Sequence, residues 1–550
     1  MSGDRGQELD WALIGGLVHR DAVTPPEPLA IGMRDGAIVF LGSDQELRAR
    51  YGEQIAVRRL SGQHVYPGFA DAHGHLYHLG SRFEEVRLEG RHSLEGTLNL
   101  VHAAVQRLPA KEWILGGGWD ESYWSEGRGP TVDDLDPVAK GRPACLLRHD
   151  CHAAWVSSAT LALAGIDAST PEIAGGRIVR DARGKPTGVL VDRAMELVMR
   201  ILPPPAPETV LRRVQQAAQA CAQAGITAVH DMGVDAPTLA ALRQLDREGR
   251  LAIRVYAALR DVPALWDEEF ARGPQMSKPG MRLTVRAVKL FADGALGSRG
   301  AALFEDYTDD PGNRGLPLLA GQELIDRLTR ATRAGYQSCV HAIGDRANRE
   351  VLDAFARMAT DGDGAAFVAL RPRIEHAQVL AESDIPRFAG LGVIASVQPL
   401  HAVSDRHWAE ERLGRERARY AYAYGSLARA RARLCFGSDF PVESYDVRYG
   451  LMAACSRRPP GFDSGVAAWN PSEQVSAAVA IAAYTSGPAY ASFGENERGR
   501  IAEGYLADLT VWDRDLSEGA ETLFTAKVVA TIVGGKVEHS GLGGRYPLRG

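Results

Sequence analysis

Long apolar runs are missing from this chain of 550 residues. No window approaches the roughly 20 consecutive apolar residues that a membrane-crossing helix needs. The opening segment, MSGDRGQELDWALIGG, contains no apolar run of the signal-peptide kind. Cysteine is scarce too, with six residues and no CxxC pair: Cys145, Cys151, Cys221, Cys339, Cys435 and Cys455. We therefore expect free, buried thiols, a reducing compartment and a cytoplasmic protein without a membrane partner.

An excess of one charge sign is also missing. The formal net charge is −6 and the isoelectric point is near 6.2, which argues against a nucleic acid or an anionic membrane as partner. Hydrophobic residues make up 45% and charged residues 24%, as in an ordinary globular protein. The length exceeds what one core needs and predicts a barrel-sized domain plus a smaller one. A homodimer stays open.

Both ends of the chain predict pairs of short strands joined by tight turns. LAIGMRDGAIVFLGS turns at Asp35-Gly36, and KVVATIVGGKVEHSG turns at Gly534-Gly535. Both dipeptides suit a hairpin that requires positive φ. The two ends together therefore predict one small β domain.

The middle of the chain alternates strand and helix patterns. Segments such as GITAVHDMG, RLTVRAVKLFADG, QSCVHAIGD, RPRIEHAQVL and ARLCFGSDFPV indicate strands, each beside a helical stretch. Such alternation over a few hundred residues favours a parallel α/β barrel. Residues 83–202 are rich in Gly and Trp and poorly periodic, which indicates an insertion.

Polar residues of metal-binding type stand at the predicted strand ends. His73 and His75, in PGFADAHGH, lie two residues apart and can share one face of a strand. A lone His-x-His pair is weak evidence, because buried histidines are often satisfied by hydrogen bonds. The chain adds His341, His376 and Asp439 at later strand ends, and Lys289 inside an apolar strand. The carboxyl ends of parallel barrel strands converge, and buried polar groups are costly unless paired or bound to metal, so the set favours a metal centre.

Five segments carry a family resemblance: PGFADAHGH, KLFADGALGSRGA, HAIGDRA, IEHAQ and FGSDFPV. They resemble the amidohydrolase superfamily, and more narrowly its YtcJ-like branch, which includes N-substituted formamide deformylases. The resemblance covers nearly the whole chain. It implies a distorted (β/α)8 TIM barrel at 67–495, with the insertion at about 83–202. It also implies a small β-sandwich domain built from residues 1–66 and 496–550.

The resemblance implies a role for each candidate ligand. His73 and His75 would hold one ion with Asp439 beside it, and His341 and His376 would hold a second. Lys289 would bridge the two as a carbamate formed with carbon dioxide. Imidazole nitrogen and carboxylate oxygen suit Zn²⁺, so two zinc ions are expected, with a single ion left open.

Asp439 and Lys289 each have an alternative interpretation. Asp439 is expected to orient the attacking water and to carry its proton to the leaving nitrogen, although it could be a structural cap. Lys289 could be an ordinary ammonium paired with a carboxylate beside one metal ion.

Further candidates for substrate contact each have a structural alternative. His152 lies in LLRHDCHAAW, where Cys151 replaces the glycine that is usual in the family. His230 could contact substrate, support a ligand or be a satisfied strand-end histidine. Asp293 and Arg299 follow Lys289 in a glycine-rich loop, where an Arg–Asp pair could simply hold a turn. Trp119 could wall an apolar pocket, although single aromatics more often pack.

The sequence thus predicts a zinc-dependent amidohydrolase that cleaves a non-peptide C–N bond with a metal-activated water. The expected substrate is an N-acyl or N-formyl amine or a related small amide. A metal-dependent deaminase, or an ester or carbamate hydrolase, on the same scaffold remains an alternative. A catalytically silent scaffold is a further alternative, which the presence of all six ligand positions disfavours.

Overall fold

The chain forms two compact units in a computed structural model. One unit comprises residues 1–77 and 210–550, and the other comprises 78–209. The structure describes residues 8–88, 90–109, 112–148, 153–173, 176–297, 299–459 and 465–541.

Eight parallel strands form a nearly closed barrel in the first unit. Their order is β19-β18-β17-β16-β15-β14-β13-β6. Gly74 forms a parallel bridge with Phe440, and the His75 amide donates to the Phe440 carbonyl at 3.0 Å, which brings the two edges together. The predicted α/β barrel is therefore confirmed. The strands are β6 (Phe69–Gly74), β13 (Ile226–Val234), β14 (Arg254–Arg260), β15 (Leu283–Phe291), β16 (Gln337–Ala342), β17 (Arg373–His376), β18 (Ile394–Val397) and β19 (Arg433–Phe436).

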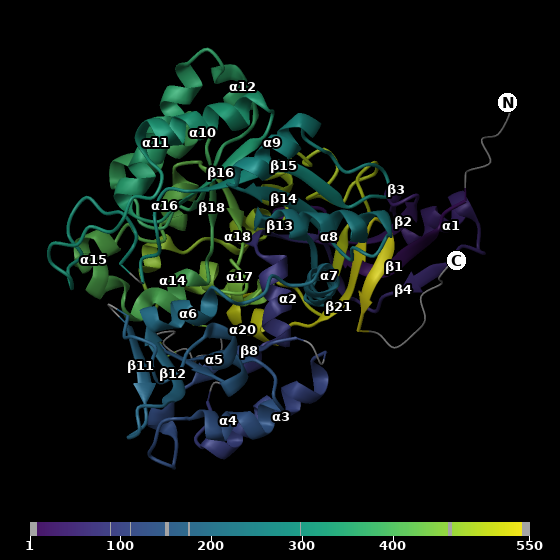
Figure 1. Cartoon of the computed structure of the whole chain (residues 1–550). Coiled ribbons are helices and arrows are strands. Elements are labelled where there is room, and N and C mark those ends of the chain that lie inside the picture. Colours follow the sequence, from purple (N-terminus) through teal and green to yellow (C-terminus); the bar gives the residue numbers. More distant parts are fainter. Residues whose placement is uncertain are drawn as a thin grey trace. The chain divides into compact units, whose positions relative to one another are not determined.

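Helices alternate with these strands along the chain, and β6, β16, β17 and β18 are buried along their whole length. Burial on both faces is what parallel strands covered by helices require. Figure 1 shows α8 to α11 around the barrel strands. The helices are α2 (Leu76–Glu84), α7 (Pro207–Gln223), α8 (Ala236–Arg247), α9 (Pro263–Arg272), α10 (Gly321–Arg333), α11 (Asp345–Thr360), α12 (Gly364–Ala369), α13 (Ile385–Leu391), α14 (His401–Ser404), α15 (Ala409–Ala418), α16 (Tyr424–Arg429), α17 (Val447–Ser456), α18 (Ala477–Tyr484), α19 (Ser486–Ala491) and α20 (Ala520–Thr525).

The two ends of the chain form a separate sheet in the same unit. Its order is β22-β21-β20-β5-β1-β2-β3, with β4 paired to β1. In Figure 1 the purple strands β1 to β4 lie beside the yellow β21. The elements are β1 (Trp11–Val18), β2 (Glu27–Arg34), β3 (Ala37–Gly42), α1 (Asp44–Tyr51), β4 (Val57–Arg59), β5 (His64–Pro67), β20 (Leu509–Trp512), β21 (Val528–Val533) and β22 (Lys536–Ser540).

Both predicted hairpins are present in the terminal sheet. Asp35 and Gly36 join β2 to β3 with φ angles of 51° and 79°. Gly534 and Gly535 join β21 to β22 with φ angles of 57° and 71°. Positive φ at both central residues matches the twist of the flanking strands, which is why these dipeptides mark hairpin turns.

The second unit has its own sheet, in the order β11-β12-β10-β9-β8-β7. Trp119, Trp124 and Trp155 pack together in its core, with ring centroids 6.2–6.3 Å apart. The elements are β7 (Val86–Arg87), α3 (Leu94–Arg107), β8 (Ile114–Trp119), α4 (Val132–Ala139), β9 (Ala144–Arg148), β10 (Ala153–Val156), α5 (Ser158–Ala164), β11 (Gly176–Arg180), β12 (Pro186–Asp192) and α6 (Glu196–Met199).

The described residues include five of the six cysteines. Cys145, Cys221, Cys339, Cys435 and Cys455 are free, and all but Cys455 are buried. Across the described ranges, no helix has both the length and the apolar character needed to cross a bilayer.

Candidate metal centre

The closure of the barrel brings His73, His75 and Asp439 together. The Asp439 amide donates to the His73 carbonyl at 2.7 Å. Asp439 Oδ1 lies 2.9 Å from His75 Nε2 and 3.6 Å from His73 Nε2. Gly437 permits this approach, because a Cβ at that position would lie 2.4 Å from the backbone nitrogen of His73. The three side chains form one group whose donor atoms could hold a metal ion.

A second group shares Asp439 and includes a histidine that the sequence analysis missed. His376, His401 and Asp439 offer three donor atoms within 4.8 Å of one another. His401 begins α14 shortly after β18, and its Nε2 lies 3.9 Å from Asp439 Oδ2. The strand-end rule that selected the other histidines could have found it, since QPLH follows a predicted strand.

Lys289 and His341 lie on the neighbouring strands β15 and β16. Lys289 is 1% exposed, and its Nζ lies 3.5 Å from His73 Nε2. No carboxylate among the described residues forms an ion pair with this Nζ. The His341 ring centroid lies 4.4 Å from that of His376. The fold thus brings all six sequence-predicted ligand positions into one region of the barrel.

Two of the candidate ligands have an unusual backbone conformation. His376 has φ = 75° and Asp439 has φ = 60°, in the left-handed region that non-glycine residues rarely adopt. Such a conformation costs about 1–3 kcal/mol at each residue and concentrates at functional sites.

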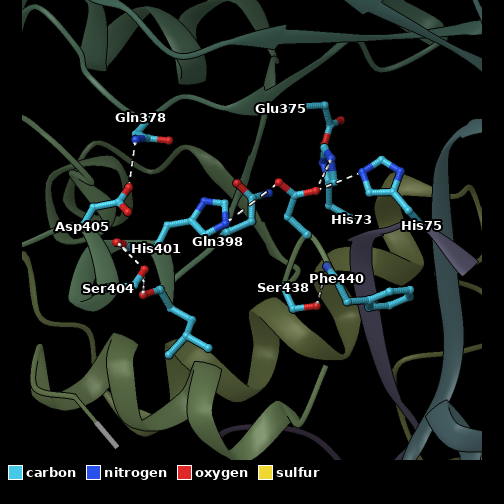
Figure 2. Close-up of polar contacts among 12 residues, drawn as sticks. His73, His75, Glu375, Gln378, Gln398, His401, Ser404, Asp405, Ser438 and Phe440 are labelled. Carbon is cyan, nitrogen blue, oxygen red and sulfur yellow. Dashed lines mark hydrogen bonds and ion pairs between the residues drawn. The ribbon is translucent and has the colours of Figure 1, made fainter. Parts of the chain in front are cut away.

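A buried ion pair between Arg373 and Glu375 supports the His73 side chain. Glu375 Oε2 accepts from His73 Nδ1 at 2.7 Å, and Figure 2 shows the two side chains side by side. Arg373 donates to both Glu375 oxygens, at 2.8 and 3.1 Å, and also to Ser396 Oγ at 2.9 Å. With its Nδ1 proton donated to a carboxylate, His73 presents the lone pair of Nε2 toward Asp439, as in carboxylate–histidine–metal arrangements.

Three of the histidines are held in the neutral form that binds metals. Burial, together with the charge of Lys289, lowers the pKa of His73 to about 4 and that of His341 to about 3. Burial also lowers the pKa of His376 well below its usual value. His376 Nδ1, His401 Nε2 and His341 Nε2 are buried without a hydrogen-bond partner among the described residues. Buried imidazole nitrogens without a hydrogen bond fit a divalent cation, because an unpaired buried polar atom is costly.

Asp439 is held in its ionised form. Burial raises its pKa, but the hydrogen bond from His75 and the nearby His73 and His401 outweigh burial. The pKa of Asp439 therefore lies below its ordinary value, and the carboxylate is available as a ligand or a proton acceptor.

The six predicted ligands and His401 line a cavity of about 410 Å³. This volume is within the size range of small-molecule sites. Part of the wall is apolar, formed by Phe291, Leu296, Trp408 and Val442. Gln378 and Asp405 add polar groups to the wall. Gln378 donates to Asp405, and Figure 2 shows this pair near His401.

His230 and Asp293, two of the candidates for substrate contact, are engaged by neighbouring groups of the barrel. His230 is buried and accepts from Arg373 at 2.8 Å. Arg373 also donates to Glu375, so His230 contacts the support of His73 and not His73 itself. Asp293 accepts the amides of Ala302, Ile343 and Gly344 at 2.8–2.9 Å. Neither His230 nor Asp293 is among the described residues that line the cavity.

Arg299 and Trp119 are engaged in local structure. Arg299 pairs with Asp309, with Nη2 to Oδ2 at 2.8 Å. Trp119 packs in the second unit and donates to the Leu146 carbonyl at 2.7 Å. His152 lies outside the described residues, so its placement stays a prediction.

Residues 57–539 match the model of the amidohydrolase family. The chain belongs to the amidohydrolase family. It is accordingly a hydrolase of carbon–nitrogen bonds and belongs to a family of metal-dependent enzymes. The family match confirms the resemblance seen in the motifs.

Relatives and a solved structure agree with this membership. The chain is 32% identical to the YtcJ amidohydrolase of Bacillus subtilis (strain 168), covering 95% of this chain and 98% of that protein. It is 28% identical to the N-substituted formamide deformylase of Arthrobacter pascens, covering 94% and 95%. A metal-dependent hydrolase from Pyrococcus furiosus matches with a TM-score of 0.77 and 31% identity, covering 92% of this chain and 99% of that one.

Proposed function

We propose that this amidohydrolase uses zinc to hydrolyse the C–N bond of an N-acyl or N-formyl amine or a related small amide. One observation carries the proposal: Asp439 is shared by two histidine groups at the wall of a small, partly apolar cavity. A shared carboxylate beside unused imidazole nitrogens suits an ion centre that also needs a proton acceptor.

His73, His75 and Asp439 would hold one ion, and His341 and His376 would hold the second. His401 is a further donor beside Asp439. When bound, the ions lower the pKa of a water molecule and polarise the amide carbonyl. The nitrogen and carboxylate donor set supports Zn²⁺ as the metal.

Lys289 would bridge the two sites as a carbamate. Its amine nitrogen would add to the carbon of carbon dioxide and release a proton, which leaves an anionic two-oxygen donor. The alternative, an ammonium paired with a carboxylate, has no such partner among the described residues. The position of Nζ at 3.5 Å from His73 Nε2 supports a bridging role.

Asp439 would move the proton of the reaction. Its Oδ1 is engaged by His75, whereas Oδ2 faces His401 at 3.9 Å. Asp439 would take a proton from the attacking water and deliver it to the leaving nitrogen, since an amine leaves far more readily once protonated.

The apolar wall supports a substrate with a hydrophobic amine substituent. Phe291, Leu296 and Trp408 would contact that group, and Gln378, which also lines the cavity, offers a polar contact. The similarity to the formamide deformylase of Arthrobacter pascens supports the same substrate class. We infer a cytoplasmic enzyme acting on small molecules, without nucleic acid or membrane partners.

The test combines metal analysis with a substrate panel. The protein is purified with added zinc and bicarbonate, and N-formyl amines, N-acyl amines, carbamates, esters and amino-substituted heterocycles are compared. We expect at least one ion in each chain and the highest kcat/KM on an N-formyl or N-acyl amine. Fewer than one ion in each chain, or turnover that survives chelation, would overturn the proposal; preference for a heterocycle or an ester would replace it by deamination or ester hydrolysis.

A further inference from the structure

A second cluster of potential metal ligands lies in the terminal sheet, outside the barrel. His19 directly follows β1, His64 begins β5 and Asp515 lies shortly after β20. These three strands are neighbours in the sheet. β1 and β5 run parallel with Leu17 opposite His64, and β20 runs antiparallel with Trp512 opposite His64. The pairing therefore brings one donor from each strand to the same end of the sheet.

The donor atoms of the cluster face one another. His19 Nε2 lies 2.9 Å from His64 Nδ1. Asp515 Oδ2 lies 4.0 Å from His19 Nε2 and 3.9 Å from His64 Nδ1. Two imidazole nitrogens and one carboxylate oxygen thus form a group that could hold an ion.

The Asp515 carboxylate is held with one oxygen turned toward the histidines. Oδ1 accepts from the Tyr66 hydroxyl at 2.7 Å, from the Ser517 amide at 2.8 Å and from the Ser517 hydroxyl at 2.7 Å. These three donors fix the rotamer through Oδ1. Oδ2 remains directed at the two imidazoles, as expected of a metal ligand whose outer contacts orient it.

His19 is equally fixed. Its ring stacks on Tyr66 with centroids 3.9 Å apart and an interplanar angle of 11°. Burial lowers the pKa of His19 to about 4, so the ring is neutral at pH 7. The side chains of His64 and Asp515 are each 14% exposed, which leaves a path for an ion and for a water ligand.

We propose that His19, His64 and Asp515 bind a divalent transition-metal ion of the Zn²⁺ type, separate from the barrel centre. Imidazole and carboxylate donors without sulfur suit such an ion, with water completing the coordination. A tetrahedral pair of nitrogens at zinc is separated by about 3.3 Å. The ion therefore requires the nitrogens to separate by a few tenths of an ångström and Oδ2 to approach them.

The ion would cross-link the two ends of the chain. His19 follows β1 and His64 begins β5, early in the chain, whereas Asp515 follows β20, late in the chain. Binding that occurs only in the folded state stabilises it. The site would therefore serve the stability of the terminal sheet and would take no part in hydrolysis.

The experiment compares Asp515→Asn and His64→Gln with the wild type and with His539→Gln. His539 is a histidine of β22 in the same sheet but outside the cluster. Asp515→Asn keeps an oxygen for the Tyr66 and Ser517 donors and replaces the atom that faces the histidines. Each protein is loaded with zinc, passed over a desalting column and measured by elemental analysis, thermal unfolding and circular dichroism.

We expect the Asp515 and His64 variants to hold one zinc ion fewer in each chain than the wild type and the His539 variant. Zinc should raise the Tm of the wild type more than that of either cluster variant, with unchanged circular dichroism and catalytic activity. Equal zinc content in all four proteins would overturn the proposal and leave a hydrogen-bonded histidine pair. The barrel ligands are intact in every variant. A result that contradicts the terminal-sheet site is therefore distinct from one that contradicts the barrel metal centre.

Discussion

The Glu375 carboxylate contacts the His73 imidazole inside the barrel, with Oε2 2.7 Å from Nδ1, although 302 residues separate the two in the chain. The contact fixes which nitrogen of His73 carries the proton. It also explains why a glutamate and an arginine occupy barrel positions that usually hold apolar side chains. Glu375 thereby orients one ligand of the proposed metal centre.

Glu375→Gln should weaken metal binding by about 10–100-fold, because such supporting contacts orient and polarise ligands. Competitive chelator titration measures the affinity. Glu473→Gln is a matched control, since Glu473 is also buried but accepts from Ser426 away from the cavity. Equal metal affinity in the two variants would contradict the orienting role.

Asp439→Asn should lower kcat by about 10²–10⁴-fold, the contribution of a positioned proton acceptor. Metal content should fall less than activity, because histidine ligands remain. Steady-state kinetics and elemental analysis on the same preparation separate the two effects. Asp405→Asn, in the wall of the same cavity, should retain far more activity. A loss of metal as complete as the loss of activity would reduce Asp439 to a ligand.

Lys289→Ala should abolish the second metal site, whereas Lys289→Glu should restore part of the metal content by supplying a carboxylate. Wild-type activity should also rise with bicarbonate after exposure to carbon-dioxide-free buffer. Lys278→Ala, at an exposed lysine, should match the wild type in both respects. Bicarbonate-independent activity and full metal content in Lys289→Ala would contradict the carbamate.

His401→Gln should lower kcat/KM by about 10²-fold or more, because its buried Nε2 faces Asp439 in the cavity wall. His407→Gln is the control, since His407 lies six residues further along the chain and is exposed. Kinetics on the preferred amide compare the two. Unchanged kcat/KM in His401→Gln would place His401 outside both the ion centre and the substrate site.

Asp508→Asn should destabilise the first unit by about 3–5 kcal/mol at pH 7, because it leaves the buried Arg254 without its counter-charge. Arg254 contacts both Asp508 oxygens, at 2.6 and 3.0 Å. Burial raises the pKa of Asp508, but Arg254 outweighs it, so the pKa is lowered in the folded state. The stabilisation is therefore present above the unfolded pKa of about 3.9 and is lost as pH falls through the lower folded value.

Thermal unfolding over a pH series tests the Asp508 prediction. The Tm difference between wild type and Asp508→Asn should be large at pH 7 and should shrink in acid. Asp353→Asn, which removes a partner from the exposed Arg387 pair, should cost at most about 1 kcal/mol. A pH-independent Tm difference for Asp508→Asn would exclude the charge interaction as its cause.

The sequence alone determined the local features of this protein. Alternating strand and helix patterns indicate the barrel, because periodicity reports which face of an element is buried. The dipeptides Asp35-Gly36 and Gly534-Gly535 fix the two hairpins, because few residues accept positive φ in succession. The six predicted ligand positions were found because strand ends converge in any parallel barrel.

Only the tertiary structure decided how these features combine. It placed His401 beside Asp439, paired Glu375 with His73 and brought His19 and His64 to Asp515. It also imposed positive φ on His376 and Asp439, against the preference of both residues. The reason is physical: these arrangements come from strand register and from the closure of the barrel and the terminal sheet, and a local sequence pattern can mark a candidate residue but does not encode its contacts.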